Sequence, residues 1–290
     1  MSFVRLISLT LITMLCFAGN SVLCRIALRQ TTLDPASFTS ARLISGALML
    51  VLLLYGRQRF FKVGTARPAG LGGNWISALA LFVYAAAFSF SYTNMSTGVG
   101  ALLLFGAVQA TMILTGLWRG ERLNSLQTAG LLIALAGVIA LLSPGLDAPP
   151  LASALLMLSA GMAWGVYSLR GRGAADPTGD TAGNFLRATP MTALLSALLL
   201  VHQHLDARGL LYAVLSGAVT SGLGYALWYA VLPQLSRTRA ATVQLSVPVL
   251  AALAGALFVN EPLTWGLLLI SIAVLGGIAL VVYGQRKLVD

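Results

Sequence analysis

The chain is a succession of apolar stretches, each about as long as the hydrocarbon core of a membrane is thick. An α-helix needs about 20 apolar residues to cross that core. Ten such segments are expected in the 290 residues, near 4–24, 36–55, 75–92, 97–117, 126–143, 151–169, 182–201, 208–231, 239–258 and 263–283. Because the loops between them are short, nothing remains for a soluble domain. The sequence therefore predicts an all-α integral membrane protein with ten transmembrane helices.

Composition excludes a soluble fold. Hydrophobic residues make up 58% of the chain, charged residues 9%, and the mean hydropathy is +0.88, values typical of a polytopic membrane protein. The first apolar segment exceeds a signal-peptide core and lacks a small-x-small cleavage site, so we expect it to stay as a span. On that span, Cys16 and Cys24 would lie about 12 Å apart along the helix, too far for a disulfide.

Two stretches of the sequence resemble each other. Residues 133–141 read IALAGVIAL and residues 272–280 read IAVLGGIAL, at an offset of 139. Upstream of each stands a Glu-x-Leu, formed by Glu121 with Leu123 and by Glu261 with Leu263, at an offset of 140. With five spans in each period, the second copy would enter the membrane upside down, as in many secondary transporters. Chance similarity between two apolar helices is the alternative, and the charge distribution decides between them.

The basic residues gather at the span ends of one side. An N-terminus on the inside places 13 of the 18 there: Arg5, Arg57, Arg59, Lys62, Arg67, Arg119, Arg122, Arg170, Arg172, Arg237, Arg239, Arg286 and Lys287. Only Arg29 and Arg208 fall opposite. By the positive-inside rule, both termini are expected in the cytoplasm. This threading places Glu121 inside and Glu261 outside, so we predict two inverted repeats of five helices, residues 1–146 and 147–290.

Three cations fall within or near the spans. We expect Arg25, nearly at the outer edge, to have an interfacial role. Arg42 and Arg187 lie about two turns into the second and seventh spans, equivalent helices of the two halves. Each would cost about 2.5–3.5 kcal/mol near the bilayer centre. Either side chain could bond helix-end carbonyls across an interface or could bind a substrate carboxylate.

The carboxylates are all expected outside the membrane centre. The eight are Asp34, Glu121, Asp147, Asp176, Asp180, Asp206, Glu261 and Asp290, and each lies in a loop, a terminus or a helix end. Proton-coupled exporters of cationic drugs commonly use an acid within the membrane, so cationic drugs are poor candidate substrates. His202 and His204 are expected in a wet loop at the outer end of the seventh span.

Neutral polar and aromatic side chains are the remaining candidates for lining a cavity. The amides are Asn20, Gln109, Asn184 and Gln244, and the aromatic residues are Tyr84, Phe88, Trp164, Tyr167, Tyr225 and Trp228. Tyr84 with Phe88, and Tyr225 with Trp228, are spaced to share a helix face, so two aromatic ridges are expected to face each other. Ordinary helix packing or an interfacial belt is the alternative for each residue.

The order of these features resembles a known family. The motifs are Phe17-Ala-Gly19-Asn20 and Trp164-Gly165, then Arg42 and Arg187, then Gly120-Glu121-Arg122-Leu123 and Asn260-Glu261-Pro262-Leu263. Each half resembles the EamA domain of the drug/metabolite transporter superfamily, and the chain is most similar to the YddG-type exporters of aromatic and other amino acids. Two positions depart from the pattern. Val108 stands where a proline is usual, as in Pro248 of the second half, and Phe17 replaces the usual Trp.

The resemblance implies a basket of ten helices around a central cavity that opens alternately to each side. It implies an amino-acid exporter of the bacterial inner membrane, with a nucleotide-sugar or other metabolite or drug carrier of the same superfamily as the alternative. The residues alone favour a zwitterion or a carboxylate. The candidate substrate-binding residues are Asn20, Arg42, Tyr84, Phe88, Gln109, Trp164, Tyr167, Arg187, Tyr225, Trp228 and Gln244.

Other classes fit less well. An integral membrane enzyme would need a nucleophile with its base, paired carboxylates or a metal cluster, and a channel would need a continuous polar pore; the sequence contains neither pattern. The basic residues form no stripe with interleaved aromatics, so nucleic acid is not an expected partner despite the net charge of +10. We expect no cofactor, amino acids and membrane lipid as partners, and a monomer or weak dimer.

Overall fold

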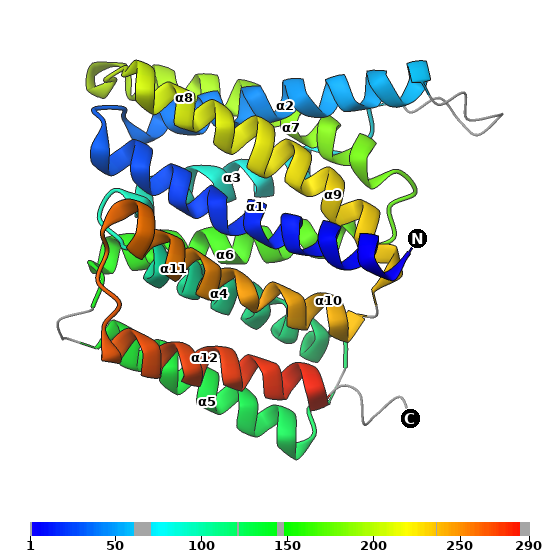
Figure 1. The fold of residues 1–290 in the computed structure, drawn as a ribbon, viewed down its shortest axis with the longest axis vertical. Coiled ribbons are helices and arrows are strands. Elements are labelled where there is room, and N and C mark those ends of the chain that lie inside the picture. Colours follow the sequence, from blue (N-terminus) through cyan, green and yellow to red (C-terminus); the bar gives the residue numbers. More distant parts are fainter. Residues whose placement is uncertain (1, 61–70, 121, 144–147, 236, 285–290) are drawn as a thin grey trace.

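A computed structural model describes residues 2–60, 71–120, 122–143, 148–235 and 237–284, and every regular element in these ranges is helical (Figure 1). The elements are α1 (Phe3–Gln30), α2 (Pro35–Phe60), α3 (Trp75–Tyr92), α4 (Thr97–Trp118), α5 (Ser125–Leu142), α6 (Leu151–Gly171), α7 (Pro177–Leu198), η1 (Leu200–His202), α8 (Ala207–Leu215), η2 (Ser216–Leu223), α9 (Gly224–Val231), η3 (Leu232–Gln234), α10 (Arg237–Gln244), α11 (Ser246–Val259) and α12 (Trp265–Gly284).

Nine helical stretches in the described ranges are long and apolar enough to cross a membrane. Elements α8 to η3 form one of them, Ala207–Gln234, and α10 with α11 forms another, Arg239–Val259. The tenth expected span corresponds to α7, which has 22 residues but contains Asp180, Arg187 and Pro190 and is not among the nine. An integral membrane bundle is therefore supported, and the tenth crossing stays a prediction.

The spans lie side by side and alternate in direction along the chain (Figure 1). The start of α1 and the end of α12 lie at the same end of the bundle, and the pair α5 and α12 forms one edge (Figure 1). We call the two ends of the bundle the Asp176 end, where α7 begins, and the Glu261 end, where α12 begins.

Helix starts follow local capping chemistry. Asn74 accepts a hydrogen bond from the Ser77 amide at the start of α3, and Asp206 accepts one from the Gly209 amide at the start of α8. Such caps satisfy amides that a helix leaves free at its first turn. For α7, Asp176 is the cap and Pro177 is the first helical residue, an arrangement that fixes the start of that helix.

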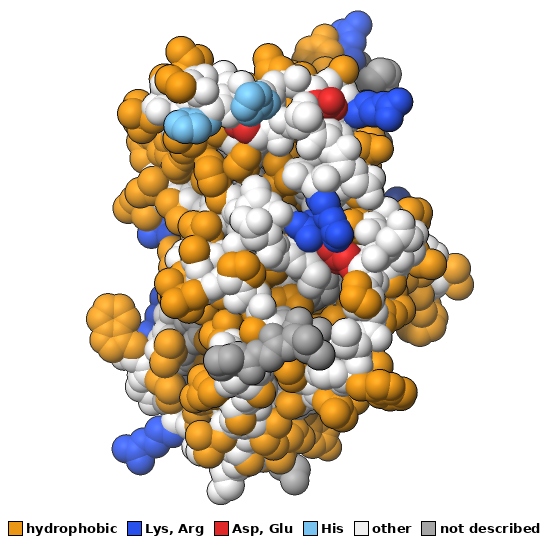
Figure 2. All heavy atoms as spheres, turned by 90° about the vertical axis from the view of Figure 1, so that its left-hand side faces the viewer, with side chains coloured by type: hydrophobic (Ala, Val, Ile, Leu, Met, Phe, Trp, Pro, Cys, Tyr) orange, Lys and Arg blue, Asp and Glu red, His pale blue; other side chains and the backbone are white. Residues whose placement is uncertain are grey.

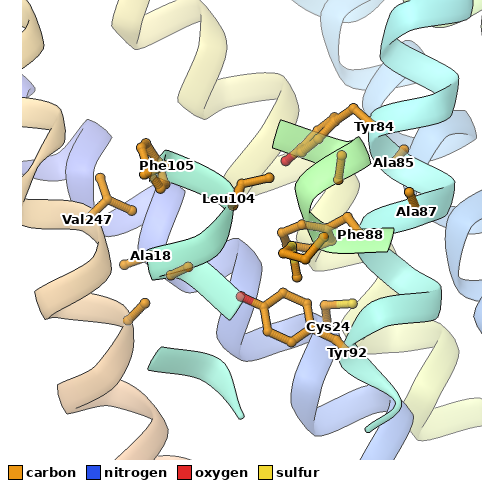
Figure 3. Close-up of a cluster of buried hydrophobic side chains, with 14 of the residues drawn as sticks. Ala18, Cys24, Tyr84, Ala85, Ala87, Phe88, Tyr92, Leu104, Phe105 and Val247 are labelled. Atoms are coloured by element: carbon orange, nitrogen blue, oxygen red, sulfur yellow. The ribbon is translucent and has the colours of Figure 1, made fainter. Parts of the chain in front are cut away.

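Large apolar side chains cover the outside as well as the inside of the bundle. Leu132, Leu194 and Ile272 are among those exposed on the sides of helices, as expected of surfaces that face lipid rather than water. Figure 2 looks onto one end of the bundle, where hydrophobic side chains are dense toward the margins and polar and charged groups lie nearer the middle. Inside, Phe88 and Tyr92 project from α3 toward Leu104 of α4 (Figure 3). The buried core continues from there into α2, α6, α7, α9 and α12.

Helices α5 and α12 touch backbone to backbone. A Cβ added to Gly130 would lie 2.5 Å from the carbonyl oxygen of Gly277, and a Cβ added to Gly277 would lie 2.5 Å from the carbonyl oxygen of Gly130. Glycine is therefore required at both positions for the approach that is seen, in the manner of small-residue contacts between membrane helices. Because α5 packs chiefly on α12, this contact holds the edge of the bundle together.

Candidate functional site

A cavity with about 420 Å³ of free space lies among spans of both halves. Its lining comes from α1, α3, α4, α6, η2, α9 and α10, and consists of Phe17, Asn20, Ser21, Tyr84, Phe88, Leu104, Phe105, Trp164, Thr220, Tyr225 and Gln244. We call it the central cavity. Aromatic rings and neutral polar groups form this lining together, a combination suited to an organic solute.

Arg42 of α2 lies directly behind the wall of the central cavity and is only 1% exposed. Its Nη2 donates to the Tyr84 hydroxyl at 2.9 Å and its Nε to the Ser221 hydroxyl at 3.3 Å. The guanidinium carbon lies 5.0 Å from the centre of the Tyr84 ring and 4.9 Å from that of Phe88. Its Nη1 is buried and donates no hydrogen bond to any described residue. Arg42 is thus a buried cation held by neutral groups.

Asn20 of α1 connects the polar groups of the two halves. Its amide nitrogen donates to the Tyr84 hydroxyl at 3.2 Å. Its oxygen accepts hydrogen bonds from Ser216 at 2.6 Å and from Thr220 at 3.4 Å. The residues on the second half belong to η2, which is a π-helix. Such wider turns are rare and often occur at functional sites, and this one directs Ser216 and Thr220 to α1 and Ser221 to α2.

The aromatic rings form a continuous wall rather than two separate ridges. Trp164 lies between the halves, with its ring centre 4.9 Å from that of Tyr84 and 5.0 Å from that of Tyr225. Phe17 contacts Tyr225 at 5.9 Å and Trp228 at 6.0 Å, both edge-on. Ring pairs at these distances attract each other beyond simple burial. The wall therefore presents both faces and edges of rings to the central cavity.

A buried ion pair closes the Glu261 end. Arg25 Nε lies 2.9 Å from Glu261 Oε1, and the two residues are 8% and 7% exposed. Arg25 also donates to the carbonyls of Tyr92 and Thr93, at 2.7 and 3.0 Å, while Glu261 Oε2 accepts from the Thr97 amide at 2.7 Å. The pair thus ties α1, the α3–α4 turn and the start of α12 together. Figure 2 looks onto this end, where basic side chains lie beside an acidic one near the middle of the face.

The Asp176 end carries an ion pair of its own. Arg57 Nη1 donates to Asp176 Oδ1 at 3.1 Å, and Nη2 donates to Oδ2. This pairing holds the pKa of the Asp176 carboxyl below its usual range. Nearby, a second cavity of about 310 Å³ is lined in part by Tyr167, Arg170 and Asp180. An ion pair therefore joins different helices at each end of the bundle.

The predicted site residues are only partly brought together. Asn20, Tyr84, Phe88, Trp164, Tyr225 and Gln244 line the central cavity, and Arg42 lies behind it. Trp228 does not line the central cavity but contacts Phe17, which does. Tyr167 lines the second cavity, and its ring stacks on that of Trp164 with the ring centres 5.4 Å apart. Gln109 is buried on α4, outside the linings of both cavities.

Arg187 lies apart from Arg42, although the sequence places the two at equivalent positions. Its Nη1 donates to the carbonyls of Gly72 at 2.6 Å and Gly183 at 2.9 Å. These contacts agree with the alternative in which Arg187 bonds backbone carbonyls and not a substrate carboxylate. Arg25 lies in a buried ion pair at the Glu261 end, and its expected position at the membrane interface stays a prediction. Glu121, the proposed repeat partner of Glu261, lies outside the described residues.

Sequence reasoning missed several lining residues. Phe17 stands in the sequence as a departure from a motif, and Thr220 lies in a stretch of small residues, 216–224. That stretch packs closely on α2, where a Cβ at Gly217 would overlap the Arg42 carbonyl. It also contributes to the cavity through Thr220, which bonds Asn20. The spacing of small polar residues on one span was the available signal, because hydroxyls on a close-packed face must find partners across it.

Known proteins share this organisation. The sequence pattern described as the EamA-like transporter family matches residues 4–143 and again residues 151–283. A solved crystal structure that is 21% identical superposes with a TM-score of 0.69, covering 98% of each chain, which shows a shared fold.

Relatives by sequence agree with this pattern. An uncharacterized protein of Pseudomonas aeruginosa is 56% identical over 96% of this chain and 94% of its own. A protein of Salmonella typhimurium named as a probable amino-acid metabolite efflux pump is 27% identical over 67% of this chain and 70% of its own. An uncharacterized transporter of Archaeoglobus fulgidus is 27% identical over 86% and 89%. This chain belongs to the EamA-like transporter family.

Proposed function

We propose that the protein exports amino acids, aromatic and other neutral ones, across the bacterial inner membrane by alternating access. The observation that carries the proposal is the central cavity, where a buried guanidinium with a free donor stands beside an aromatic wall. An amino acid has a carboxylate that can bind the guanidinium and a side chain that can pack on the aromatic wall. Probable amino-acid metabolite efflux pumps of Salmonella typhimurium and Escherichia coli, at 27% and 26% identity, support the same substrate class.

The lining of the central cavity favours a solute that can stack on aromatic rings. A nucleotide-sugar carrier is the alternative, because a guanidinium such as that of Arg42 also suits a phosphate.

Alternating access is proposed to rest on ten spans in two inverted halves, residues 1–146 and 147–290. The two family matches support a duplication. The packing supports its inversion, because α1 packs on the α8–α9 span and on α11 as α6 packs on α3 and α4. With five alternating spans in each half, equivalent helices run in opposite directions (Figure 1). Both termini are proposed to be cytoplasmic, with the Asp176 end inside, and the protein to act as a monomer or weak dimer.

Exchange across liposomes tests the substrate class. Purified protein should exchange labelled tryptophan and threonine for unlabelled substrate and should leave a labelled sugar nucleotide outside. Asn20→Leu should reduce exchange strongly, because it removes the amide that bonds Tyr84, Ser216 and Thr220. Leu132→Ala, on the exposed side of α5, is the matched control and should retain it. Exchange of the sugar nucleotide in place of the amino acids would refute the proposal.

A further inference from the structure

The charge of the central cavity is not balanced by any nearby acid in the part of the chain that the structure describes. Five carboxylates lie in the described residues, and each is engaged at a helix end: Asp34 at the start of α2, Asp176 with Arg57, Asp180 with the Gly73 amide, Asp206 at the start of α8 and Glu261 with Arg25. None of the residues that line the central cavity is acidic. Arg42 therefore gives this part of the bundle a net positive charge.

Neutral partners compensate that charge only in part. Two hydroxyls accept hydrogen bonds from Arg42, and two ring faces lie close to its guanidinium. Contacts with ring faces and hydroxyls offset only part of the cost of burying a charge without a counter-ion. A bound anion would remove this imbalance.

Tyr84 extends the reach of Arg42 to the cavity surface. Its hydroxyl accepts hydrogen bonds from Arg42 and from Asn20, which use both of its lone pairs. Its proton can then be donated only to a further acceptor. The neutral Tyr225 hydroxyl lies within hydrogen-bonding reach, and a carboxylate in the cavity that Tyr84 lines is the stronger acceptor. Tyr84 thus brings the charge of Arg42 to a ligand in the cavity, and behind it the buried Nη1 of Arg42 has no acceptor among the described residues.

The lining provides no comparable partner for an ammonium group. The Asn20 oxygen already accepts two hydrogen bonds, and Gln244 is the other amide in the lining. Neutral acceptors and ring faces contribute less to binding an ammonium than a carboxylate would, since bonds between charged partners are about twice as strong as neutral ones.

We propose that Arg42 is the carboxylate-recognition residue, and that the central cavity selects ligands by their carboxylate and does not require an ammonium group. Aromatic monocarboxylates are then ligands of the same cavity, and aromatic amines are not. The inference rests on the proposed function for the location of the site, and it extends the substrate class from amino acids to monoanionic carboxylates.

Three ligands with the same indole ring test the inference on the purified wild-type protein by calorimetric titration. Tryptophan carries both charged groups, indole-3-propionate only the carboxylate, and tryptamine only the ammonium. Since a hydrogen bond to a neutral partner contributes about 1 kcal/mol, indole-3-propionate should bind within about tenfold of tryptophan. Tryptamine should bind at least about tenfold more weakly than either, because a hydrogen bond to a charged group is worth about 1.5–3 kcal/mol.

The outcomes separate the inference from the proposed function. Binding of tryptophan and tryptamine without indole-3-propionate would overturn the inference and leave amino-acid export standing. Binding of indole-3-propionate without tryptophan or tryptamine would support the inference and remove amino acids as substrates. Absence of binding by all three would overturn both.

Variants of Arg42 assign the effect to this residue. Arg42→Met should weaken indole-3-propionate binding at least about tenfold and leave tryptamine binding unchanged or tighter, a reversal that an unfolded protein cannot produce. Arg29→Met, a matched change at a residue whose side chain is 50% exposed, should leave all three affinities unchanged. Unaltered binding of indole-3-propionate by Arg42→Met would overturn the inference.

If Arg42→Met does not fold, Arg42→Lys tests the same inference. It keeps the positive charge and should retain the order of the three ligands with lower affinity for the two carboxylates. Equal binding of indole-3-propionate and tryptamine by this variant would overturn the assignment.

Discussion

Removing Glu261 should destabilise the protein far more than removing its cationic partner. In Glu261→Ala, Arg25 loses its counter-ion and the Thr97 amide loses its acceptor. Breaking a buried ion pair from one side typically costs about 3–5 kcal/mol. Arg25→Met should cost less, because Arg29 Nη1 already lies 3.9 Å from Glu261 Oε1 and is half-exposed, so its side chain can move in as a substitute.

Two further variants separate charge from hydrogen bonding. Glu261→Gln keeps one acceptor oxygen and should lose about 1–3 kcal/mol, the cost of one unsatisfied buried group. Arg25→Leu combined with Glu261→Leu removes both charges together and should cost less than Glu261→Ala alone, since a buried pair can often be replaced by apolar residues at little cost.

Thermal unfolding of the purified protein in detergent measures these effects. At about 2–4 °C per kcal/mol, Glu261→Ala should lower the melting temperature by roughly 10 °C, with Arg25→Met falling between it and the wild type. Arg29→Met is the control and should change it little. A loss of less than about 1 kcal/mol in Glu261→Ala, or an equal loss in Arg29→Met, would refute the account of a buried pair.

Four further outcomes are expected. A single cysteine at Ser125 should resist an impermeant thiol reagent in intact cells while one at Pro262, equally exposed, should react; labelling of both would refute the inverted arrangement. Exchange in liposomes should barely respond to an imposed pH difference, and uphill accumulation driven by one would reveal a proton carrier. Trp164→Ala should weaken tryptophan binding roughly threefold to tenfold, at about 0.5–1.5 kcal/mol per ring pair, and threonine binding much less; equal losses would indicate packing. Asp176→Asn should lower the melting temperature at pH 7, and the difference should shrink as the pH falls below about 4, through the lowered pKa of Asp176 beside Arg57; a difference that persists in acid would refute that pairing.

Helix positions were predictable because each span is one apolar run with clear ends. The span expected at 208–231 corresponds to α8 through η3, and that at 263–283 to α12. The seventh was placed at 182–201 but runs from 177 to 198. Hydropathy alone underestimates the polar first turn of α7, where Asp176 and Pro177 mark the start.

The residue types of the site could be predicted from the sequence, but the contacts between them could not. Arg42 and Arg187 have the same residue type and are expected at equivalent positions of the second and seventh spans, yet one is 1% exposed beside the aromatic wall and the other bonds a loop carbonyl. Depth along a helix can be read from sequence, whereas the face that meets a given neighbour depends on how all the spans pack. For the same reason the pairing of Arg25 with Glu261, across 236 residues, had no local signal.

The close contact of Gly130 with Gly277 also implies a delay in assembly, because α5 is synthesised well before α12. The two residues are separated by 147 positions (277 − 130), so a ribosome working at about 5–20 residues per second needs roughly 7–30 s between them. During that interval α5 is already made and lacks the helix on which it chiefly packs, so lipid must cover its glycine face. Synthesis of α12 therefore completes this edge of the bundle, and a chain that stalls before α12 would leave α5 open to the quality-control proteases of the membrane.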